Sequence, residues 1–273
     1  MSDSRFIIPQ VIQTDVVDEN GDPRGYVAFM DRIRGWPLMA TQKKRSIEEL
    51  RLSRGDAALD VGCGTGEEVV AMAKEVADTG RCVGIDASET MLAEARRRTG
   101  GLGLIIEFNK GDVYDIQFGD EVFNGVRAER VLEHLDHPEK ALSELVRVTR
   151  RGGRVVAIAP DFDSFAFDFP DRDIARTLTH FMCDQKANGW AGRRLYGMFQ
   201  DAGLSEISCE VFTHIHLDPS AVDFIENAAT LAEAAGLISS DALRQALVYA
   251  KAMRSQSRVF YTTPNFLIAG TRS

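Results

Sequence analysis

The chain has 273 residues, 44% of them hydrophobic and 27% charged, values that are ordinary for a globular protein with room for a large core. Its 41 acidic side chains outnumber the 32 lysines and arginines and give a formal net charge of −9. This balance argues against nucleic acid as the main partner, because phosphate binding needs a surplus of basic side chains.

The N-terminal region is expected to be an arm followed by a helical cap. A turn cluster occupies residues 20–25, and residues 26–34 and 38–52 show helical spacing around a break at Gly35-Trp36-Pro37. The sequence shows no signal peptide and no apolar run of membrane-spanning length, and its four cysteines are scattered without a Cys-x-x-Cys pair. These features favour a cytoplasmic protein without a membrane partner, a disulfide framework or a metal site.

Residues 56–86 form the most informative unit. A short apolar run ends in Asp60 and is followed by a glycine cluster, then by helical spacing over 67–77, and then by a second apolar run that ends in Asp86. This order predicts a strand, glycine loop, helix and strand, and therefore a parallel sheet.

The glycine loop and Asp86 together predict a site for an adenosine-type cofactor. Glycines let the backbone approach a ligand, and the helix that follows offers free N–H groups. An acid at the tip of the second strand is where a ribose diol is commonly held. The spacing Gly-x-Gly-x-Gly differs from that of dinucleotide binders, and Asp60 suits a ligand that carries an ammonium group rather than a pyrophosphate.

The alternation of strand and helix signals continues along the chain. Strands are expected at 104–109, 122–128 and 154–159, with helices at 88–98 and from Pro138 onward. The loop after the fifth strand holds four phenylalanines in eight residues, at an edge where open sheets bind ligands. They are candidates for an apolar substrate pocket or for packing under a lid: Phe162, Phe165, Phe167 and Phe169.

The last third predicts an elaborated end to the sheet. A helical region over 171–203 breaks at 188–192, a strand covers 204–216, and two helices are expected within 219–256 before a last strand at 258–270. Pro264 implies a bulge or an edge in that last strand. The helical pair suggests a lid over the substrate site or a subunit interface of a homo-oligomer.

Residues 59–66, 83–86 and 111–113 resemble, in order and spacing, the cofactor motifs of class I S-adenosylmethionine (SAM)-dependent methyltransferases. The similarity is to the ubiquinone- and menaquinone-biosynthesis type and to natural-product enzymes that act on small molecules. It implies an α/β fold with a Rossmann-like, seven-stranded, mostly parallel sheet, helices on both faces, N-terminal helices and a helical insertion before the last strand. We expect one domain: cap 1–52, SAM-binding core 53–217 with 257–273, and insertion 218–256.

The motifs and the resemblance together give a set of expected cofactor contacts. They are Tyr26, Asp60, Gly62, Gly64, Gly66, Asp86, Ala87, Met91, Gly111, Asp112, Val113, Arg127 and Ala128. In similar O-methyltransferases a histidine and an aspartate follow the fourth and fifth strands. That implies His137 as a base oriented by Asp161, with His134 as a further candidate.

Several functions stay open on the sequence alone. The first is transfer of a methyl group from SAM to an apolar or aromatic small molecule in secondary metabolism, with S-adenosylhomocysteine (SAH) as the product. The second is methylation of a prenyl or aromatic carbon without a dedicated base. A third is a non-catalytic SAM-binding subunit. An NAD(P) oxidoreductase is disfavoured by the glycine spacing.

Overall fold

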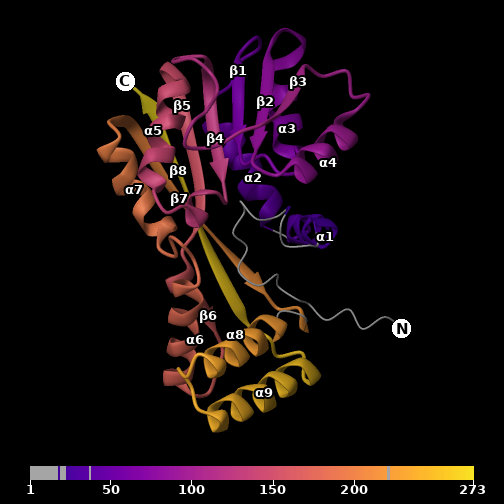
Figure 1. The fold of residues 1–273 in the computed structure, drawn as a ribbon, viewed down its shortest axis with the longest axis vertical. Coiled ribbons are helices and arrows are strands. Elements are labelled where there is room, and N and C mark those ends of the chain that lie inside the picture. The colour runs from indigo at the N-terminus through magenta and orange to yellow at the C-terminus, as the bar shows by residue number, and fades with distance from the viewer. Residues whose placement is uncertain (1–17, 19–22, 37, 220–221) are drawn as a thin grey trace.

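The computed structural model describes residue 18 and residues 23–36, 38–219 and 222–273. These residues form an eight-stranded sheet in the order β3-β2-β1-β4-β5-β8-β6, with β7 paired to β8 (Figure 1). The expected N-terminal arm falls outside the described residues apart from Asp18. Among the described helices, none is long and apolar enough to cross a membrane.

The strands are β1 (Ala57–Val61), β2 (Arg81–Asp86), β3 (Ile106–Lys110), β4 (Phe123–Glu129), β5 (Thr149–Pro160), β6 (Ala166–Phe167), β7 (Leu204–His216) and β8 (Tyr261–Arg272). The α-helices are α1 (Pro23–Arg34), α2 (Met39–Glu49), α3 (Glu67–Val76), α4 (Glu89–Thr99), α5 (Pro138–Val148), α6 (Arg172–Asp184), α7 (Ala191–Asp201), α8 (Val222–Ala234) and α9 (Ser240–Ser255). Short 3-10 turns are η2 (Ala77–Thr79), η3 (Leu132–His134) and η4 (Phe162–Ser164).

The alternation of side chains along β1 explains why helices cover both faces of the sheet. Leu59 and Val61 enter a buried cluster with residues of α5 and α7, whereas Ala58 enters a second cluster with residues of α3 and α4. Strands β1 to β5 run parallel, so their side chains are buried on both faces, as their near-continuous apolar sequences require. The prediction of a mostly parallel sheet with helices on both faces is confirmed.

The strand count differs from the expected seven. The additional strand is β6, whose two residues pair antiparallel with Thr262 and Tyr261 of β8. The aromatic loop after β5 therefore continues the sheet for two residues, which the phenylalanine-rich sequence did not reveal because its alternation is too short.

Pro264 marks no bulge in β8, but it lies where one side of the strand is locally unpaired, which agrees with the edge alternative. β8 is paired on both sides, with β5 and β6 along one edge and β7 along the other, and the β7 register passes through Pro264 without a shift. The Pro264 carbonyl accepts from the Asp161 backbone N–H at 3.1 Å, on the side where β5 has just ended. The missing proline N–H thus lies in the gap between β5 and β6, where no ladder bond is lost.

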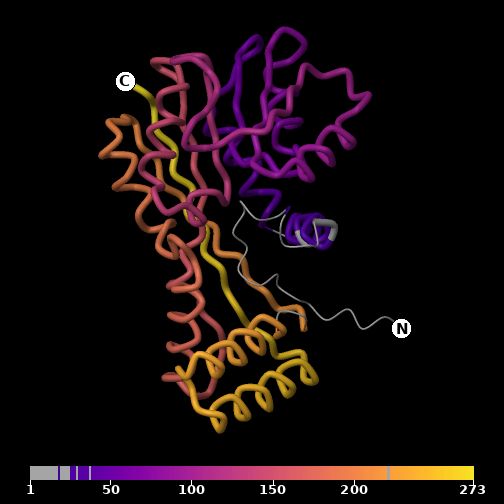
Figure 2. The backbone as a smooth tube through the Cα atoms, viewed as in Figure 1, coloured from indigo at the N-terminus to yellow at the C-terminus, as the bar shows by residue number. Residues whose placement is uncertain are grey.

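A second hydrophobic core lies apart from the main sheet. It is built by α6, α8 and α9 around the start of β8 and the loop after β5. Figures 1 and 2 show the long strands β7 and β8 running from the main sheet into this lower body. The predicted helical insertion is therefore confirmed, and it packs against the aromatic loop.

Candidate active site

The glycine loop between β1 and α3 has one open side. All three glycines have positive φ, and a Cβ atom at Gly62 would lie 2.4 Å from Val131 Cγ2, whereas one at Gly64 would meet nothing within 4 Å. Gly62 is thus required by packing against the β4–α5 loop. Gly64 faces free space, where a ligand can approach the backbone.

This contrast predicts different effects of two alanine substitutions. Gly62→Ala forces a clash with Val131 and should lower the free energy of unfolding by about 1–3 kcal/mol, as overpacking does. Gly64→Ala meets only the strain of a left-handed backbone, about 1–2 kcal/mol, but it should weaken SAM binding by filling the open side. Chemical denaturation and calorimetry on both variants check this; the expectation fails if Gly64→Ala binds SAM as the wild type does.

Asp86 is fixed beside the open glycine. Its Oδ2 accepts from the Gly64 backbone N–H at 2.8 Å and its Oδ1 from the Ser88 N–H at 2.9 Å. Burial raises the pKa of this carboxyl, and the two backbone bonds oppose that rise. A carboxylate has about four acceptor sites, so Asp86 retains capacity for two hydroxyl donors. Its contact with a ribose stays a prediction.

The loops after β2 and β3 lie next to one another. The Gly111 N–H donates to the Asp86 backbone carbonyl at 3.1 Å, and Ser88 caps α4 by accepting from the Met91 N–H at 3.2 Å. Met91 is buried, Gly111 and Val113 are half-buried, and Ala87 and Asp112 are exposed. The Asp112 side chain accepts from the Tyr114 N–H at 2.8 Å, which closes a turn. The loops after β2 and β3 therefore bring the expected cofactor contacts close together, and contact of each residue with the cofactor stays a prediction.

Arg127 binds two buried carboxylates at the wall of the cavity beside the glycine loop. Its Nη1 donates to Asp60 Oδ1 at 2.9 Å, and its Nη2 donates to Glu129 Oε2. Glu129 also accepts from Gln42 Nε2 at 2.7 Å, which joins α2 of the cap to β4. Burial raises the pKa of Asp60 to about 7, with Arg127 opposing the rise. Ala128 is buried in β4 next to Arg127, and contacts of both residues with SAM stay predictions.

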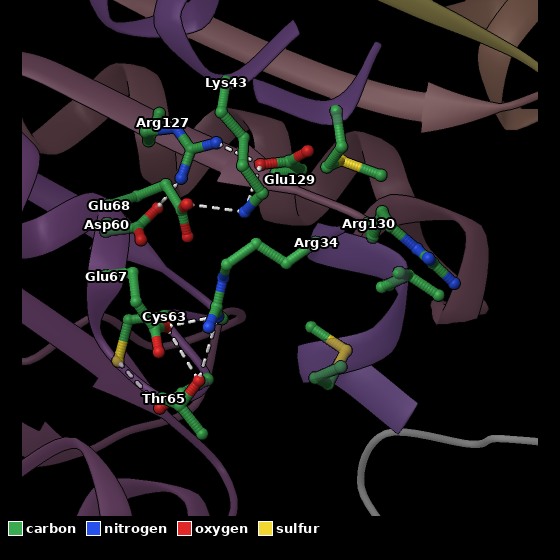
Figure 3. A pocket seen from close by; sticks show the side chains of 15 residues that line it. Arg34, Lys43, Asp60, Cys63, Thr65, Glu67, Glu68, Arg127, Glu129 and Arg130 are labelled. Atoms are coloured by element: carbon green, nitrogen blue, oxygen red, sulfur yellow. Dashed lines mark hydrogen bonds and ion pairs between the residues drawn. The ribbon is translucent and has the colours of Figure 1, made fainter. Parts of the chain in front are cut away.

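The α1–α2 cap closes over the glycine loop. Arg34 pairs with Glu67 Oε2 at 2.6 Å and with Thr65 Oγ1 at 3.3 Å (Figure 3). Between them remains a cavity of about 40 Å³, lined among others by Asp60, Gly62 and Gly64. Small-molecule sites usually measure about 300–1,000 Å³. Binding of a nucleoside cofactor therefore requires Arg34 or α1 to move.

The predicted histidine–aspartate pair does not form. Asp161 is fully buried and is bound by Arg193, whose Nη2 donates to Asp161 Oδ1 at 2.7 Å and whose Nε donates to Oδ2. His137 is exposed at the start of α5, where its backbone N–H donates to the Tyr114 hydroxyl at 3.1 Å. A buried carboxylate takes the nearest guanidinium in a bidentate pair, so Asp161 orients Arg193 and not His137.

The four phenylalanines of the loop after β5 pack in or against the second hydrophobic core, the one built by α6, α8 and α9. Phe165 lies 5.6 Å from the Tyr261 ring and Phe169 lies 5.1 Å from Tyr249, both measured between ring centroids. Phe162 and Phe167 pack against the same cluster and are half-buried. This packing agrees with the alternative that the four phenylalanines pack under a lid. Contact of the phenylalanines with a substrate stays a prediction.

Comparison with known proteins agrees with this geometry. Residues 59–157 match the family described as a methyltransferase domain. An uncharacterised 37.1 kDa transposon protein of Streptomyces fradiae is 34% identical over 215 residues, which are 78% of this chain and 60% of that protein. The demethylmenaquinone methyltransferase of Staphylococcus saprophyticus is 34% identical over 188 residues, covering 63% of this chain and 80% of the relative. The chain belongs to the class I SAM-dependent methyltransferases.

A solved structure shares the fold of this methyltransferase. Phosphoethanolamine N-methyltransferase 2 of Haemonchus contortus, in complex with SAM, superposes with a TM-score of 0.62 at 17% identity, covering 96% of this chain and 60% of that chain. The cofactor of the family, SAM, fits the residues present: an open glycine, a carboxylate with spare acceptor sites, and Asp60 on the cavity wall for an ammonium group.

Sequence reasoning missed a group of polar residues around Arg130 in this methyltransferase. Arg130 lines the cavity beside the glycine loop but points away from the Asp60–Arg127 pair (Figure 3). Burial raises the pKa of Tyr26 in α1, and the charge of Arg130 opposes that rise. Burial lowers the pKa of Lys186 after α6, and Arg130 lowers it further. The charged residues within 130–134 could have predicted this group, because they directly follow a central strand and therefore lie at the edge of the sheet where ligands bind.

Proposed function

We propose that this methyltransferase transfers a methyl group from SAM to an aromatic small molecule with a hydroxyl group, in natural-product biosynthesis. The observation that supports the proposal is a row of aromatic rings in contact, with an edge-to-face pair, Trp36 and His216, followed by a stacked pair, His216 and Tyr261. Trp36 lies 4.3 Å from His216, and His216 lies 4.9 Å from Tyr261, between ring centroids. Such rings favour a flat aromatic molecule.

The position of the rings supports their use as an acceptor surface. Tyr261 is buried, which raises its pKa well above the ordinary value, and Arg130 opposes that rise. Arg130 also lines the cavity beside the glycine loop. The rings therefore lie within electrostatic reach of a residue at the cofactor site. The relative from Staphylococcus saprophyticus is named for a demethylated menaquinone, a quinone substrate that supports an aromatic acceptor here.

The chemistry needs little from the protein beyond placement. Bound SAM supplies a methyl carbon that a sulfonium makes electrophilic, and the protein brings the acceptor into line with it and excludes water. The cap is joined to the core by buried pairs, such as Arg154 Nη2 with Glu49 Oε2 at 2.7 Å. We infer one domain made of a cap, 1–52, a core formed by 53–217 and 257–273, and an insertion, 218–256.

The test is product formation from a defined acceptor. The full chain is incubated with SAM and naphthalene-1,4-diol under reducing conditions, and SAH and methylated product are measured by mass spectrometry. We expect SAH in step with product; proton NMR then distinguishes oxygen from carbon methylation. SAM binding without turnover of this diol or of simple phenols would favour the non-catalytic subunit instead.

A further inference from the structure

Glu133 carries a carboxylate that the fold buries without a hydrogen bond. It lies in η3, is 0% exposed, and both Oε1 and Oε2 lack a hydrogen-bond partner within the described part of the chain. The nearest basic atoms are Arg130 Nε at 3.9 Å and His134 Nε2 at 3.7 Å, both beyond hydrogen-bond distance. Burying a carboxylate without a hydrogen bond is costly, which makes Glu133 a candidate for binding a donor group that enters the site.

The segment between α6 and α7 brings polar groups next to the loop that carries Glu133. The Asn188 backbone N–H donates to the Glu133 carbonyl at 3.1 Å, and the Asn188 Nδ2 atom is itself buried without a partner. Lys186 stands over the Phe162 ring, with Nζ 5.2 Å from its centroid. Burial and the charge of Arg130 lower the pKa of Lys186, and Glu133 opposes this. The Glu133 carboxylate and the Asn188 side-chain amide are thus both buried without a hydrogen bond in segments that the Asn188 backbone N–H joins.

The loop that carries Glu133 adjoins the cofactor site. Arg130 lines the cavity beside Gly62 and Gly64, and Glu133 follows it by three residues in the loop after β4. Tyr26 of the cap interacts electrostatically with both sites. Burial raises its pKa most, and the charges of Asp86 and Glu133 each raise it further. Arg130 therefore links the two sites, because it lines the cavity and its Nε lies 3.9 Å from Glu133 Oε1.

We propose that Glu133 binds the hydroxyl group of the acceptor and takes its proton during methyl transfer. The inference rests on the proposed function. The acceptor O–H bond breaks and its proton passes to a Glu133 oxygen. An electron pair of the acceptor oxygen forms the new bond to the methyl carbon, and the carbon–sulfur bond breaks with its pair left on sulfur, giving SAH. Asn188 and Lys186 stabilise the developing charge on the acceptor.

The titration of Glu133 agrees with this role. Burial raises its pKa to about 7. Arg130, the nearby N–H of its own backbone and Lys186 oppose the rise, and Glu129 adds to it. A base is most effective when its pKa lies near the working pH. Because only the ionised form accepts a proton, binding of a neutral phenol should strengthen as the pH rises through about 7.

The test uses SAH-loaded full-length protein, with 1-naphthol and 1-methoxynaphthalene as probes that differ in one O–H group. Calorimetry first shows that wild type, Glu133→Gln and the matched control Glu139→Gln, an exposed acid of α5, bind SAH equally. We then expect wild type and control to prefer 1-naphthol at least tenfold, and Glu133→Gln to lose that preference and the rise in affinity with pH.

The outcomes distinguish failure of the proposed function from failure of the proposed role of Glu133. Failure of the wild type to bind SAH would end the proposed function, whereas SAH binding without a preference for 1-naphthol would overturn only the role of Glu133. A Glu133→Gln protein that keeps the preference would overturn it as well. If that variant does not fold, the wild-type pH profile decides: affinity for 1-naphthol that stays constant between pH 5.5 and 8 contradicts the proposal.

Discussion

Arg127→Met is expected to lower the free energy of unfolding by about 3–5 kcal/mol, the usual cost of removing one partner from a buried ion pair. Arg127 is 2% exposed and is the main partner of Asp60, which is equally buried, and it also holds Glu129. Methionine fills a similar volume but leaves Asp60 without its cation and Glu129 with Lys43 alone, whose Nζ lies 3.7 Å from Glu129 Oε2. Urea denaturation at pH 7 measures the loss.

A matched triple variant separates charge from packing. Adding Asp60→Asn and Glu129→Gln to Arg127→Met removes the uncompensated charges, so a large part of the lost stability should return. As a surface control, Arg54→Met removes an exposed ion pair with Asp78 and should change stability by less than about 1 kcal/mol. If Arg127→Met is no worse than this control, Arg127 does not hold the centre of the site together.

Asp86→Ala is expected to weaken SAM binding by about 1–3 kcal/mol, the cost of leaving buried hydroxyl groups unpaired. The substitution also frees the Gly64 and Ser88 backbone N–H groups that Asp86 now binds, so the glycine loop loses its support from β2. Calorimetric titration with SAM measures the change, which corresponds to about a tenfold to hundredfold rise in Kd.

The control for this prediction lies three residues further on. Glu89 begins α4, and its side chain is exposed and pairs with Arg96 at 2.6 Å. Glu89→Ala should leave SAM affinity unchanged while it removes an acid close to the same edge of the sheet. Equal affinities of Asp86→Ala and the wild type would contradict the assignment of Asp86 to the ribose.

The parts of the fold that the sequence predicts well are those governed by nearby residues. The β1–α3–β2 unit follows from apolar runs and glycines within residues 56–86, and Ser88 caps α4 as its place before the helix suggests. The family resemblance extends this to the sheet and to SAM. Each of these predictions depends on patterns that are a few residues long.

The parts that could not be predicted depend on which distant side chains meet. Asp161 and Arg193 pair across 32 positions, so nothing local distinguished an orienting acid from a structural ion pair. In the sequence, Arg127 stands near the end of a central strand. Only the fold shows that its guanidinium binds both Asp60 and Glu129. The burial of Glu133 could not be predicted either, because an acid just before a helix is common and is usually exposed to solvent.

The most direct measurement of the central claim is calorimetric titration of the full chain with SAM, SAH and NAD. The account predicts that SAM and SAH bind with one site per chain and that NAD does not compete, because Gly64 and Asp86 form a site for a single nucleoside beside an ammonium-binding acid. Binding of NAD with no binding of SAM or SAH would contradict it.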